Sequence, residues 1–472
     1  MDNLDKRIDE FIESKKDEIV DNIIKLINIP SPATEANGDH PYGDGSAKAI
    51  DAALQLGKDF GFSTKNYGYH AASIRYDKAS EEEIGFFAHM DVVPAGNNWT
   101  YEPYNAVYED GFIIGRGSND DKGPFISALY TLLCCKELDL PIKKSIRLVI
   151  GGNEENGMPD LKHYLDAEPK KPVFSMVADA SFPVCYAEKG MITVTSKTDD
   201  VCENIVELRG GEVPNVVCDS VYVVLQNVSV EDAENAVKGH DCTVEEVEGN
   251  VKITARGVAT HAAKPAKSVN AIAVLANAIV DKGILRTKEN AAMKGIASYL
   301  ADFYGESFNI SSEDEDTGRT THVSGIIRNN GKAIAINFNI RFPVSITSKE
   351  IFTEITKKFA DYGFTIDYND DEYVLLEPGY VDPKLPIVKK LTSIYNEVAD
   401  DDKESFYEGS YTYARLIPNA VAFGPHFPDV KIPFTDGRGK EHMPDECVSV
   451  QNLLDAIKIY VKSVIEIDKY YQ

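Results

Sequence analysis

Residues 84–94 read Ile84-Gly85-Phe86-Phe87-Ala88-His89-Met90-Asp91-Val92-Val93-Pro94, a short apolar run that ends at an imidazole and a carboxylate. Two later runs follow the same plan: residues 146–150 lead to Glu154-Glu155, and residues 173–178 lead to Asp179. Runs of this length with many β-branched or aromatic residues are typical of buried parallel strands. Parallel strands end at one edge of a sheet, so we expect these polar residues to gather at the carboxyl edge of an α/β sheet, where such folds place their chemistry.

These strand-end residues are suited to binding a divalent metal ion. An imidazole with several carboxylates offers mostly oxygen donors and some nitrogen, a ligand set that suits zinc, manganese or cobalt. His89 and Asp91 face the same side of an extended backbone, so Asp91 can accept the second ring proton of His89. A lone His-x-Asp sequence is more often a surface turn, but the three strand ends together predict a hydrolase with a metal centre.

Length and composition limit the possible classes of function. The chain has 472 residues, enough for two or three domains. Its 49 basic and 76 acidic side chains give a formal charge of −27, so we expect no nucleic-acid or membrane partner. The seven cysteines form no Cys-x-x-Cys pair, which indicates neither a disulfide framework nor a thiolate zinc site and fits a reducing compartment. Residues 1–16 lack a continuous apolar segment, so we predict a cytoplasmic protein without a signal peptide or anchor.

The order of patterns predicts a doubly wound, mostly parallel α/β domain interrupted by an α+β insert. Helical spacing and strand-like runs alternate as far as Asp179. Beyond it, strands with polar alternation, clearest over residues 333–342, indicate an antiparallel sheet with one wet face. Helices are expected over residues 4–29, 47–60, 125–138, 269–280, 347–359, 385–398 and 452–470. We place the first domain at residues 1–190 and 383–472 and the insert at 191–382.

Two glycine-containing loops carry further carboxylates. The first, Gly115-Arg116-Gly117-Ser118-Asn119-Asp120-Asp121-Lys122-Gly123-Pro124, is consistent with a tight turn and an aspartate helix cap, but it could also return Asp120 to bridge two ions. In the second, Gly151-Gly152-Asn153-Glu154-Glu155-Asn156-Gly157, neighbouring carboxylates repel unless a cation or a proton separates them. Such a pair is usually just solvated; at a metal, Glu155 would be the ligand and Glu154 the general base.

In order, His89-Met90-Asp91-Val92-Val93-Pro94, the residue 115–124 loop, Glu154-Glu155 and Asp179 resemble the co-catalytic metallopeptidases, the family of aminoacylase, carnosinase and glutamate carboxypeptidases. The length and the large insert most resemble its bacterial PepV-type dipeptidases and their manganese-dependent relatives. The resemblance covers essentially the whole chain. It implies two divalent ions, zinc or manganese, and a cis peptide bond after Asp120.

The resemblance also implies a ligand set. His89, Asp120 and Asp179 would serve one ion, and Asp120, Glu155 and His442 the other, with Asp120 as the bridge. His442 stands in Gly439-Lys440-Glu441-His442-Met443-Pro444-Asp445-Glu446, which resembles the family's last ligand segment. Without that resemblance, His442 would be an ordinary loop histidine.

The insert resembles the family's lid domain. Within Gly257-Val258-Ala259-Thr260-His261-Ala262-Ala263-Lys264-Pro265, His261 matches the histidine that hydrogen-bonds the developing oxyanion. The resemblance also assigns Asn215 and Arg341 to substrate binding, and an arginine fork suits a peptide's terminal carboxylate; alone, Arg341 would be a strand-end surface charge. The chain departs from PepV-type enzymes at Gly409-Ser410-Tyr411, where consecutive glycines are expected, so the substrate pocket could be reshaped.

The resemblance implies a dipeptidase that acts on unblocked dipeptides. Glu154 would deprotonate water held by the two ions, Asp91 would orient His89, and one ion with His261 would stabilise the oxyanion. An N-acyl-amino-acid deacylase using the same site is the alternative, because the family reuses this chemistry on several amides. A metal-loaded binding protein without turnover is a further alternative, against which the presence of Glu154 argues. The large insert favours a monomer.

Overall fold

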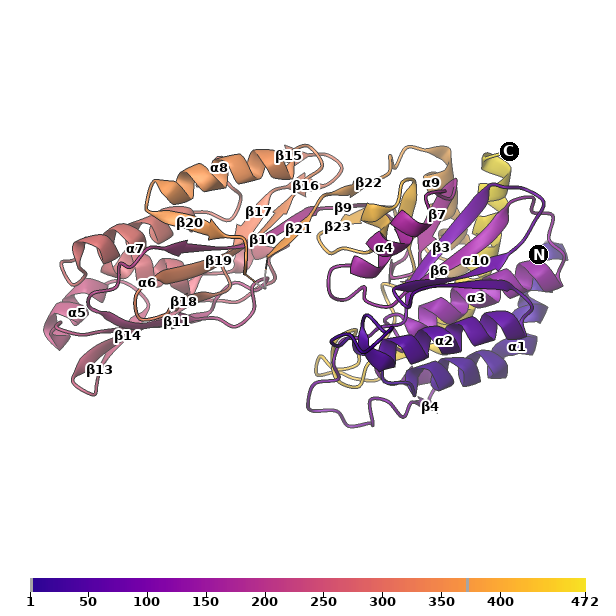
Figure 1. Cartoon of the computed structure of the whole chain (residues 1–472), viewed down its shortest axis with the longest axis horizontal. Helices are drawn as coiled ribbons and strands as arrows, with labels where there is room; N and C mark the ends of the chain where they lie inside the picture. Colours follow the sequence, from indigo (N-terminus) through magenta and orange to yellow (C-terminus); the bar gives the residue numbers. More distant parts are fainter. Residues whose placement is uncertain (1–2, 371–372) are drawn as a thin grey trace. The chain divides into compact units, whose positions relative to one another are not determined.

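The computed structural model describes residues 3–370 and 373–472, which form two compact units. Unit 1 comprises Met1–Ala187, Tyr380–Tyr407 and Tyr411–Gln472, and unit 2 comprises Glu188–Gly379 and Glu408–Ser410 (Figure 1). Residues 1–2 of the predicted first domain and residues 371–372 of the predicted insert lie outside the described residues. The chain thus enters unit 2 twice, once through a long insert and once through three residues.

Unit 1 is built on a sheet whose centre is parallel. In chain order its main strands are β1 Ser63–Tyr67, β2 Ala71–Tyr76, β3 Glu83–His89, β6 Ser145–Gly151, β7 Phe174–Val177, β9 Val184–Glu188 and β24 Ala420–Phe423. Their spatial order is β1, β2, β6, β3, β7, β24 and β9. Strands β6, β3, β7 and β24 pair in parallel, whereas β1, β2 and β9 pair antiparallel at the flanks. The three apolar runs of the sequence are β3, β6 and β7, and the predicted mostly parallel sheet is confirmed.

The sequence pattern does not predict the fourth parallel strand, β24. Its four residues, Ala420–Phe423, are all buried, and Ala420 pairs with Ser175 of β7. An apolar run this short, inside a stretch rich in glycine and proline, shows no periodicity that would mark it as a strand. Its pairing with a strand from before the insert is what closes unit 1 around one sheet.

Helices surround this sheet. They are α1 Asn3–Ile27, α2 Gly43–Asp59, α3 Lys122–Glu137, α4 Pro159–Ala167, α9 Pro386–Ala399 and α10 Val450–Tyr470. Helices α1, α2, α3, α9 and α10 share one core cluster with the strands, and α4 contacts β2. Helices α3 and α10 contact β3, and α2 contacts β1 and β2. Helix α3 begins earlier than predicted, at Lys122, whose buried Nζ donates hydrogen bonds to the carbonyl oxygens of Leu26 (2.9 Å) and Ile29 (2.7 Å). These acceptors replace water and allow a lysine to lie inside the core.

A small second sheet in unit 1 brings the end of the chain to the loop before α3. It consists of β4 Val107–Glu109, β5 Phe112–Ile114 and β26 Cys447–Ser449. Cys447 of β26 pairs with Ile114 of β5, and the backbone N of Gly115 donates to the oxygen of Glu446 at 2.8 Å. The segment before β26 is thereby placed beside residues 115–124.

Unit 2 contains an antiparallel sheet with helices packed against it, as the predicted α+β fold class requires. Its main strands are β10 Gly190–Thr198, β11 Ile205–Gly210, β12 Ser220–Leu225, β13 Cys242–Val247, β14 Asn250–Arg256, β18 Ile327–Asn329, β19 Ile334–Phe342 and β20 Phe364–Asp367. The spatial order is β13, β14, β12, β11, β18, β19, β10 and β20. Helices α5 Val230–Val237, α6 Ala271–Ile279, α7 Thr287–Tyr299 and α8 Ser348–Ala360 share a second core cluster with these strands.

The predicted wet face of this sheet is wrong at β19. The apolar residues that alternate along the strand join the core cluster, as predicted. However, Asn337, Asn339 and Arg341 on the opposite face are also buried, at 2%, 1% and 3% exposure. Nδ2 of Asn337 and of Asn339 donate to the Oγ1 atoms of Thr195 (3.3 Å) and Thr193 (2.8 Å) on β10. These hydrogen bonds offset the burial of polar groups, a compensation that sequence alternation alone does not reveal.

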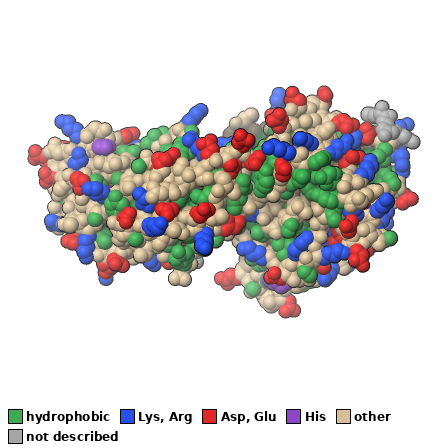
Figure 2. All heavy atoms as spheres, turned by 90° about the horizontal axis from the view of Figure 1, so that it is seen from above, with side chains coloured by type: hydrophobic (Ala, Val, Ile, Leu, Met, Phe, Trp, Pro, Cys, Tyr) green, Lys and Arg blue, Asp and Glu red, His purple; other side chains and the backbone are tan. Residues whose placement is uncertain are grey.

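Acidic and basic side chains are mixed on the face of the molecule that Figure 2 shows, over both units. The formal charge of −27 is therefore not collected in one patch on that face. Within residues 3–370 and 373–472, no helix is both long and apolar enough to cross a bilayer.

Glu289, in the first turn of α7, ties that helix to the start of β11. Its Oε1 accepts hydrogen bonds from the backbone N atoms of Glu203, Asn204 and Ile205 at 2.7, 2.7 and 2.8 Å. Its Oε2 accepts a further bond from the N of Arg286 at 2.9 Å. The side chain is fully buried, so water cannot take its place as the acceptor.

Glu289→Ala should lower the free energy of unfolding by at least about 2 kcal/mol, because four backbone donors lose their acceptor and those of Asn204 and Ile205 are buried. Glu234→Ala, at an exposed position of α5, is the control and should change that free energy by less than about 0.5 kcal/mol. Denaturant unfolding gives the difference, and hydrogen exchange should rise at residues 203–205 in the Glu289 variant alone. Equal stability of the two variants would contradict this account.

Candidate metal centre

Side chains from three strand ends and one loop meet at the carboxyl edge of the unit 1 sheet. Strand β3 ends at His89, β6 leads into Glu154 and Glu155, and β7 leads into Asp179. Ligand atoms of His89, Asp120 and Glu155 lie within 4.8 Å of one another. Those of His89, Glu154 and Asp179 form a second group with the same limit. The edge predicted from the sequence therefore gathers these residues in one place.

Asp120 lies between two histidines. Its Oδ1 is 2.9 Å from Nε2 of His89, and its Oδ2 is 3.0 Å from Nε2 of His442. His442 is also 3.1 Å from Oε2 of Glu155, and His89 is 3.8 Å from Oδ2 of Asp179. The pairing of β26 with β5 explains how His442 reaches this loop from a distant part of the chain. One carboxylate with an oxygen on each side is the arrangement that a ligand bridging two ions needs.

Asp91 supports the loop that carries Glu154 and Glu155. Its Oδ1 accepts a hydrogen bond from the N of Glu154 at 3.0 Å, and its Oδ2 accepts one from the N of Glu155 at 3.2 Å. Nδ1 of His89 lies 2.9 Å from the backbone oxygen of Asp91 and 3.3 Å from its Oδ1. The sequence predicts the contact between Asp91 and the His89 ring, but not the hydrogen bonds from the loop after β6 to Asp91.

Burial disfavours the ionised form of the clustered carboxylates unless positive charge lies beside them. Burial raises the pKa of Asp179 well above its usual value, and the charge of Asp120 raises it further. Burial and Asp120 likewise raise the pKa of Glu155. Hydrogen bonds from His442 to Asp120 and Glu155 raise the pKa of that imidazole to about 11. Divalent cations would relieve the same repulsion, and carboxylate and imidazole donors match zinc or manganese, so these residues fit a two-ion centre.

Glu154 keeps one oxygen unpartnered inside the cluster. Its Oε1 is buried and has no hydrogen-bond partner within residues 3–370 and 373–472. Burial raises the pKa of Glu154 well above its usual value. Buried polar atoms nearly always have a partner, so an oxygen without one indicates a place for a small bound species such as water or a metal ion.

Sequence reasoning misses Glu446, which shapes the loop that carries Asp120. Its Oε1 accepts hydrogen bonds from the N atoms of Gly117 (3.1 Å), Asn119 (2.9 Å) and Asp120 (3.0 Å). Its Oε2 accepts a hydrogen bond from Nη1 of Arg116 at 2.5 Å. Burial raises the pKa of Glu446 to about 6. Glu446 and Arg116 are 330 residues apart in sequence, so no local pattern could have shown the pair.

Asp121 connects the same loop to β3. Its Oδ2 accepts a hydrogen bond from the backbone N of His89 at 2.9 Å. The peptide bond between Asp120 and Asp121 is cis, as the family resemblance implies. The two adjacent aspartates thus have different surroundings, one beside the histidines and one against the strand.

The predicted substrate residues Asn215, His261 and Arg341 all belong to unit 2. The backbone oxygen of Asn215 accepts a hydrogen bond from the N of Ala262 at 2.9 Å. Burial lowers the pKa of His261, and the nearby charge of Arg341 lowers it further, so the ring is neutral near pH 7. Nδ1 of His261 accepts from the N of Ala263 at 3.3 Å, which leaves the ring proton on Nε2 as a donor.

Arg341 lies against the segment in which the chain departs from PepV-type enzymes. Nη1 of Arg341 donates to the backbone oxygen of Gly409 at 2.6 Å, and its Nε donates to Oδ1 of Asn339 at 2.9 Å. A Cβ atom placed on Gly409 would lie 2.9 Å from the Cβ of Ala263. Within unit 2, the backbone before Ser410 is therefore packed closely against predicted substrate residues.

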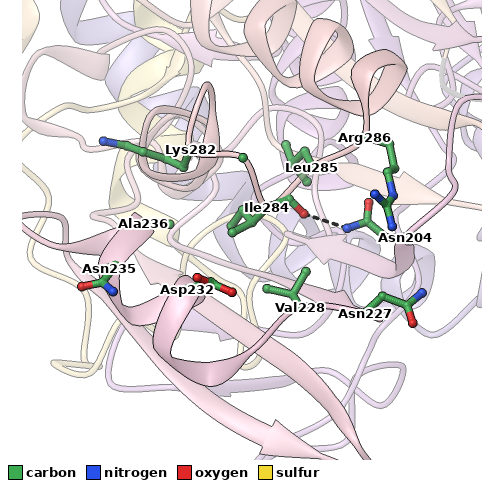
Figure 3. Close-up of a pocket in the computed structure, with 11 residues that line it drawn as sticks. Asn204, Asn227, Val228, Asp232, Asn235, Ala236, Lys282, Ile284, Leu285 and Arg286 are labelled. Atoms are coloured by element: carbon green, nitrogen blue, oxygen red, sulfur yellow. Dashed lines mark hydrogen bonds between the residues drawn. The ribbon is translucent and has the colours of Figure 1, made fainter.

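One pocket of unit 2 contains none of the predicted site residues. Its volume is about 320 Å³, and its lining comes from the segment before β11, from α5 and from the turn before α7 (Figure 3). Nδ2 of Asn204 donates to the oxygen of Ile284 at 2.7 Å within this lining. Its charged residues Asp232, Lys282 and Arg286 are mixed in sign and do not form a ligand set for a metal ion.

Known proteins are similar to this chain in sequence or in fold. The family described as Peptidase family M20/M25/M40 matches residues 85–466. YtjP of Bacillus subtilis (strain 168), described as a candidate dipeptidase, is 29% identical over 475 residues, which cover 98% of this chain and 99% of its own. Human carnosine dipeptidase 1 matches with a TM-score of 0.61 and 13% identity over 99% of both chains. The dipeptidase Dug1p from Saccharomyces cerevisiae matches with a TM-score of 0.61 and 14% identity over 99% of both chains. At these identities the two solved structures show the fold alone.

Protein freed of metal with a chelator and then given manganese should bind two ions per chain. At a free concentration 100 times Kd, one bound ion stabilises the folded state by about 2.7 kcal/mol, so the melting temperature should rise. Asp120→Asn should lose both ions, because Asp120 faces both histidines. Asp166→Asn, at an exposed position on α4, is the matched control and should bind as the wild type does. Elemental analysis that finds two ions in Asp120→Asn would contradict the bridging role.

Proposed function

We propose that this chain, which belongs to the peptidase family M20/M25/M40 and is a metallopeptidase, hydrolyses the peptide bond of unblocked dipeptides. A relative of nearly equal length that is described as a candidate dipeptidase supports this substrate class. The observation that carries the proposal is the buried cluster in which Glu154 keeps an unpartnered oxygen close to His89 and Asp179.

Five residues would hold two divalent ions, zinc or manganese. We assign His89, Asp120 and Asp179 to one ion and Asp120, Glu155 and His442 to the other. The two oxygens of Asp120, each beside a different histidine, support the bridging role. When bound, such ions lower the pKa of water to about 7 and stabilise negative charge on a carbonyl oxygen.

Glu154 is the general base in this proposal. Its carboxylate takes a proton from the water that attacks the scissile carbonyl carbon and gives it to the nitrogen as the C–N bond breaks. Asp91 supports this role because it holds the backbone of Glu154 and Glu155. Glu154 also lies within ligand distance of His89 and Asp179, so its alternative role is that of a metal ligand. The metal content of a Glu154 variant separates these two roles.

We propose that unit 2 serves as the lid that binds the rest of the substrate. The neutral ring of His261 would donate its Nε2 proton to the oxygen that becomes negative during attack. Arg341 would bind the terminal carboxylate of the dipeptide through its planar fork, and Asn215 would add a polar contact. The contact of Arg341 with Gly409 suggests that the Ser410-Tyr411 segment limits the size of the side chain accepted.

We further propose a monomeric enzyme of the cytoplasm. Seven free cysteines suit a reducing compartment, and a formal charge of −27 disfavours nucleic acid and anionic membranes as partners. The large inserted unit supports a monomer, because we expect a smaller insert where the lid histidine comes from a partner chain. Sedimentation that shows a tight dimer would contradict the monomer.

Glu154→Gln should keep both ions and lose hydrolysis, with kcat lower by at least about 1,000-fold, because the amide cannot accept the proton. Glu155→Gln is the matched comparison and should lose metal as well as activity. Elemental analysis and initial rates on one dipeptide measure both effects. Substantial turnover by Glu154→Gln would remove Glu154 from the role of base, and loss of an ion would make it a ligand.

Unblocked dipeptides should be hydrolysed faster than N-acetyl and N-succinyl amino acids. Arg341→Lys should raise KM for dipeptides by about tenfold or more, because an ammonium cannot form the paired contact of a guanidinium fork. The same substitution should change little for a dipeptide whose carboxyl end is amidated. A clear preference for the N-acyl substrates would favour a deacylase instead.

A further inference from the structure

Tyr413 and Asp160 form a buried pair next to the loop that carries Glu154. The hydroxyl of Tyr413 donates a hydrogen bond to Oδ2 of Asp160 at 2.5 Å. The two residues are 1% and 0% exposed. Tyr413 begins the short helix η2 Tyr413–Leu416, and Asp160 lies in the first turn of α4. Neither side chain has a part in the proposed reaction, so the pair calls for a separate explanation.

Asp160 holds the loop at the point where it leaves β6. The same Oδ2 accepts a hydrogen bond from the N of Asn153 at 2.9 Å, and Oδ1 accepts one from the N of Leu161 at 2.7 Å. Asn153 directly precedes Glu154, whose own N is held by Asp91. The backbone of the loop is therefore fixed by two carboxylates, and the direction of the Glu154 side chain depends on both.

Gly151 allows the Tyr413 hydroxyl to reach this position. A Cβ atom on Gly151 would lie 1.7 Å from the hydroxyl oxygen of Tyr413 and 2.2 Å from Oδ2 of Asp160. Gly151 pairs with His89 in the sheet, and its oxygen accepts a hydrogen bond from the N of Met90 at 2.9 Å. The hydroxyl thus lies directly against the strand that pairs with the end of β3, where the metal cluster begins.

The charge states of the pair suit a lasting hydrogen bond. Burial raises the pKa of Tyr413 well above its usual value, and Asp160 and Asp91 raise it further, so the hydroxyl remains a donor. Burial and the charge of Asp91 raise the pKa of Asp160 to about 6, so its carboxylate is mostly ionised above pH 7. A hydrogen bond to an ionised acceptor is shorter and stronger than one between neutral groups.

We infer that Tyr413 is a positioning residue, whose hydrogen bond fixes the Asp160 carboxylate and, through the backbone of Asn153, the direction of Glu154. The inference rests on the proposed role of Glu154 as the general base. Without the hydroxyl, the carboxylate of Asp160 can rotate and the loop can shift. A displacement of about 1 Å in a reacting group can cost about a hundredfold in rate.

Tyr413→Phe tests the inference, because the substitution removes only the hydroxyl. We expect kcat to fall about tenfold or more, with KM within about twofold and an unchanged metal content. Tyr130→Phe is the matched control: Tyr130 is also fully buried, and its hydroxyl donates to Oε1 of Glu18 at 2.9 Å on another helix. This control should keep wild-type kinetics.

Hydrogen exchange gives a second readout that does not need turnover. Exchange at residues 152–158 should be faster in Tyr413→Phe than in the wild type, and unchanged in Tyr130→Phe. If Tyr413→Phe does not fold, Asp160→Asn, which keeps an acceptor oxygen but not the charge, takes its place in both measurements. A kcat within twofold of the wild type, or unchanged exchange at the loop, would overturn the inference. If the wild type does not hydrolyse dipeptides but Tyr413→Phe still shows faster exchange at residues 152–158, the proposed function is overturned. The effect of Tyr413 on the loop would then stand.

Discussion

Negative charge is confined at one buried edge of the unit 1 sheet, and the loops around that edge are held in place by hydrogen bonds. Carboxylates of Asp120, Glu154, Glu155 and Asp179 lie in two overlapping groups whose ligand atoms are within 4.8 Å. Burial raises the pKa values of the Glu154, Glu155 and Asp179 carboxylates, because water cannot offset the repulsion between their negative charges. Buried carboxylates this close together stay ionised only beside cations. The fold must therefore hold them in fixed positions around the place where a cation binds.

Backbone N–H groups provide much of that rigidity. Asp91, Glu446 and Asp160 are buried carboxylates outside the assigned ligand set, and each accepts hydrogen bonds from a loop that carries a ligand or the base. The buried acidic residues at this edge thus divide into those that face the cluster and those that hold its loops. This division explains why so many carboxylates lie in one small volume without all of them being ligands.

The sequence predicted the parts of the fold that local patterns report. Strands β3, β6 and β7 are apolar runs with a polar residue at their carboxyl end, and parallel pairing brings those ends together whatever the intervening chain does. Strand β24 escaped prediction because four residues carry no periodicity. Glu446 and the Tyr413–Asp160 pair escaped because their partners lie far away in sequence. The buried polar row of β19 escaped because alternation shows polarity and not burial.

We propose that Asp120 joins two ions at this edge of the sheet. Anomalous X-ray diffraction from crystals grown with manganese measures the ion positions without any assumption about activity. We expect two peaks about 3.5–4 Å apart, one on each side of the Asp120 carboxylate, with His89 beside one and His442 beside the other. A single peak, or peaks that do not contact Asp120, would contradict it.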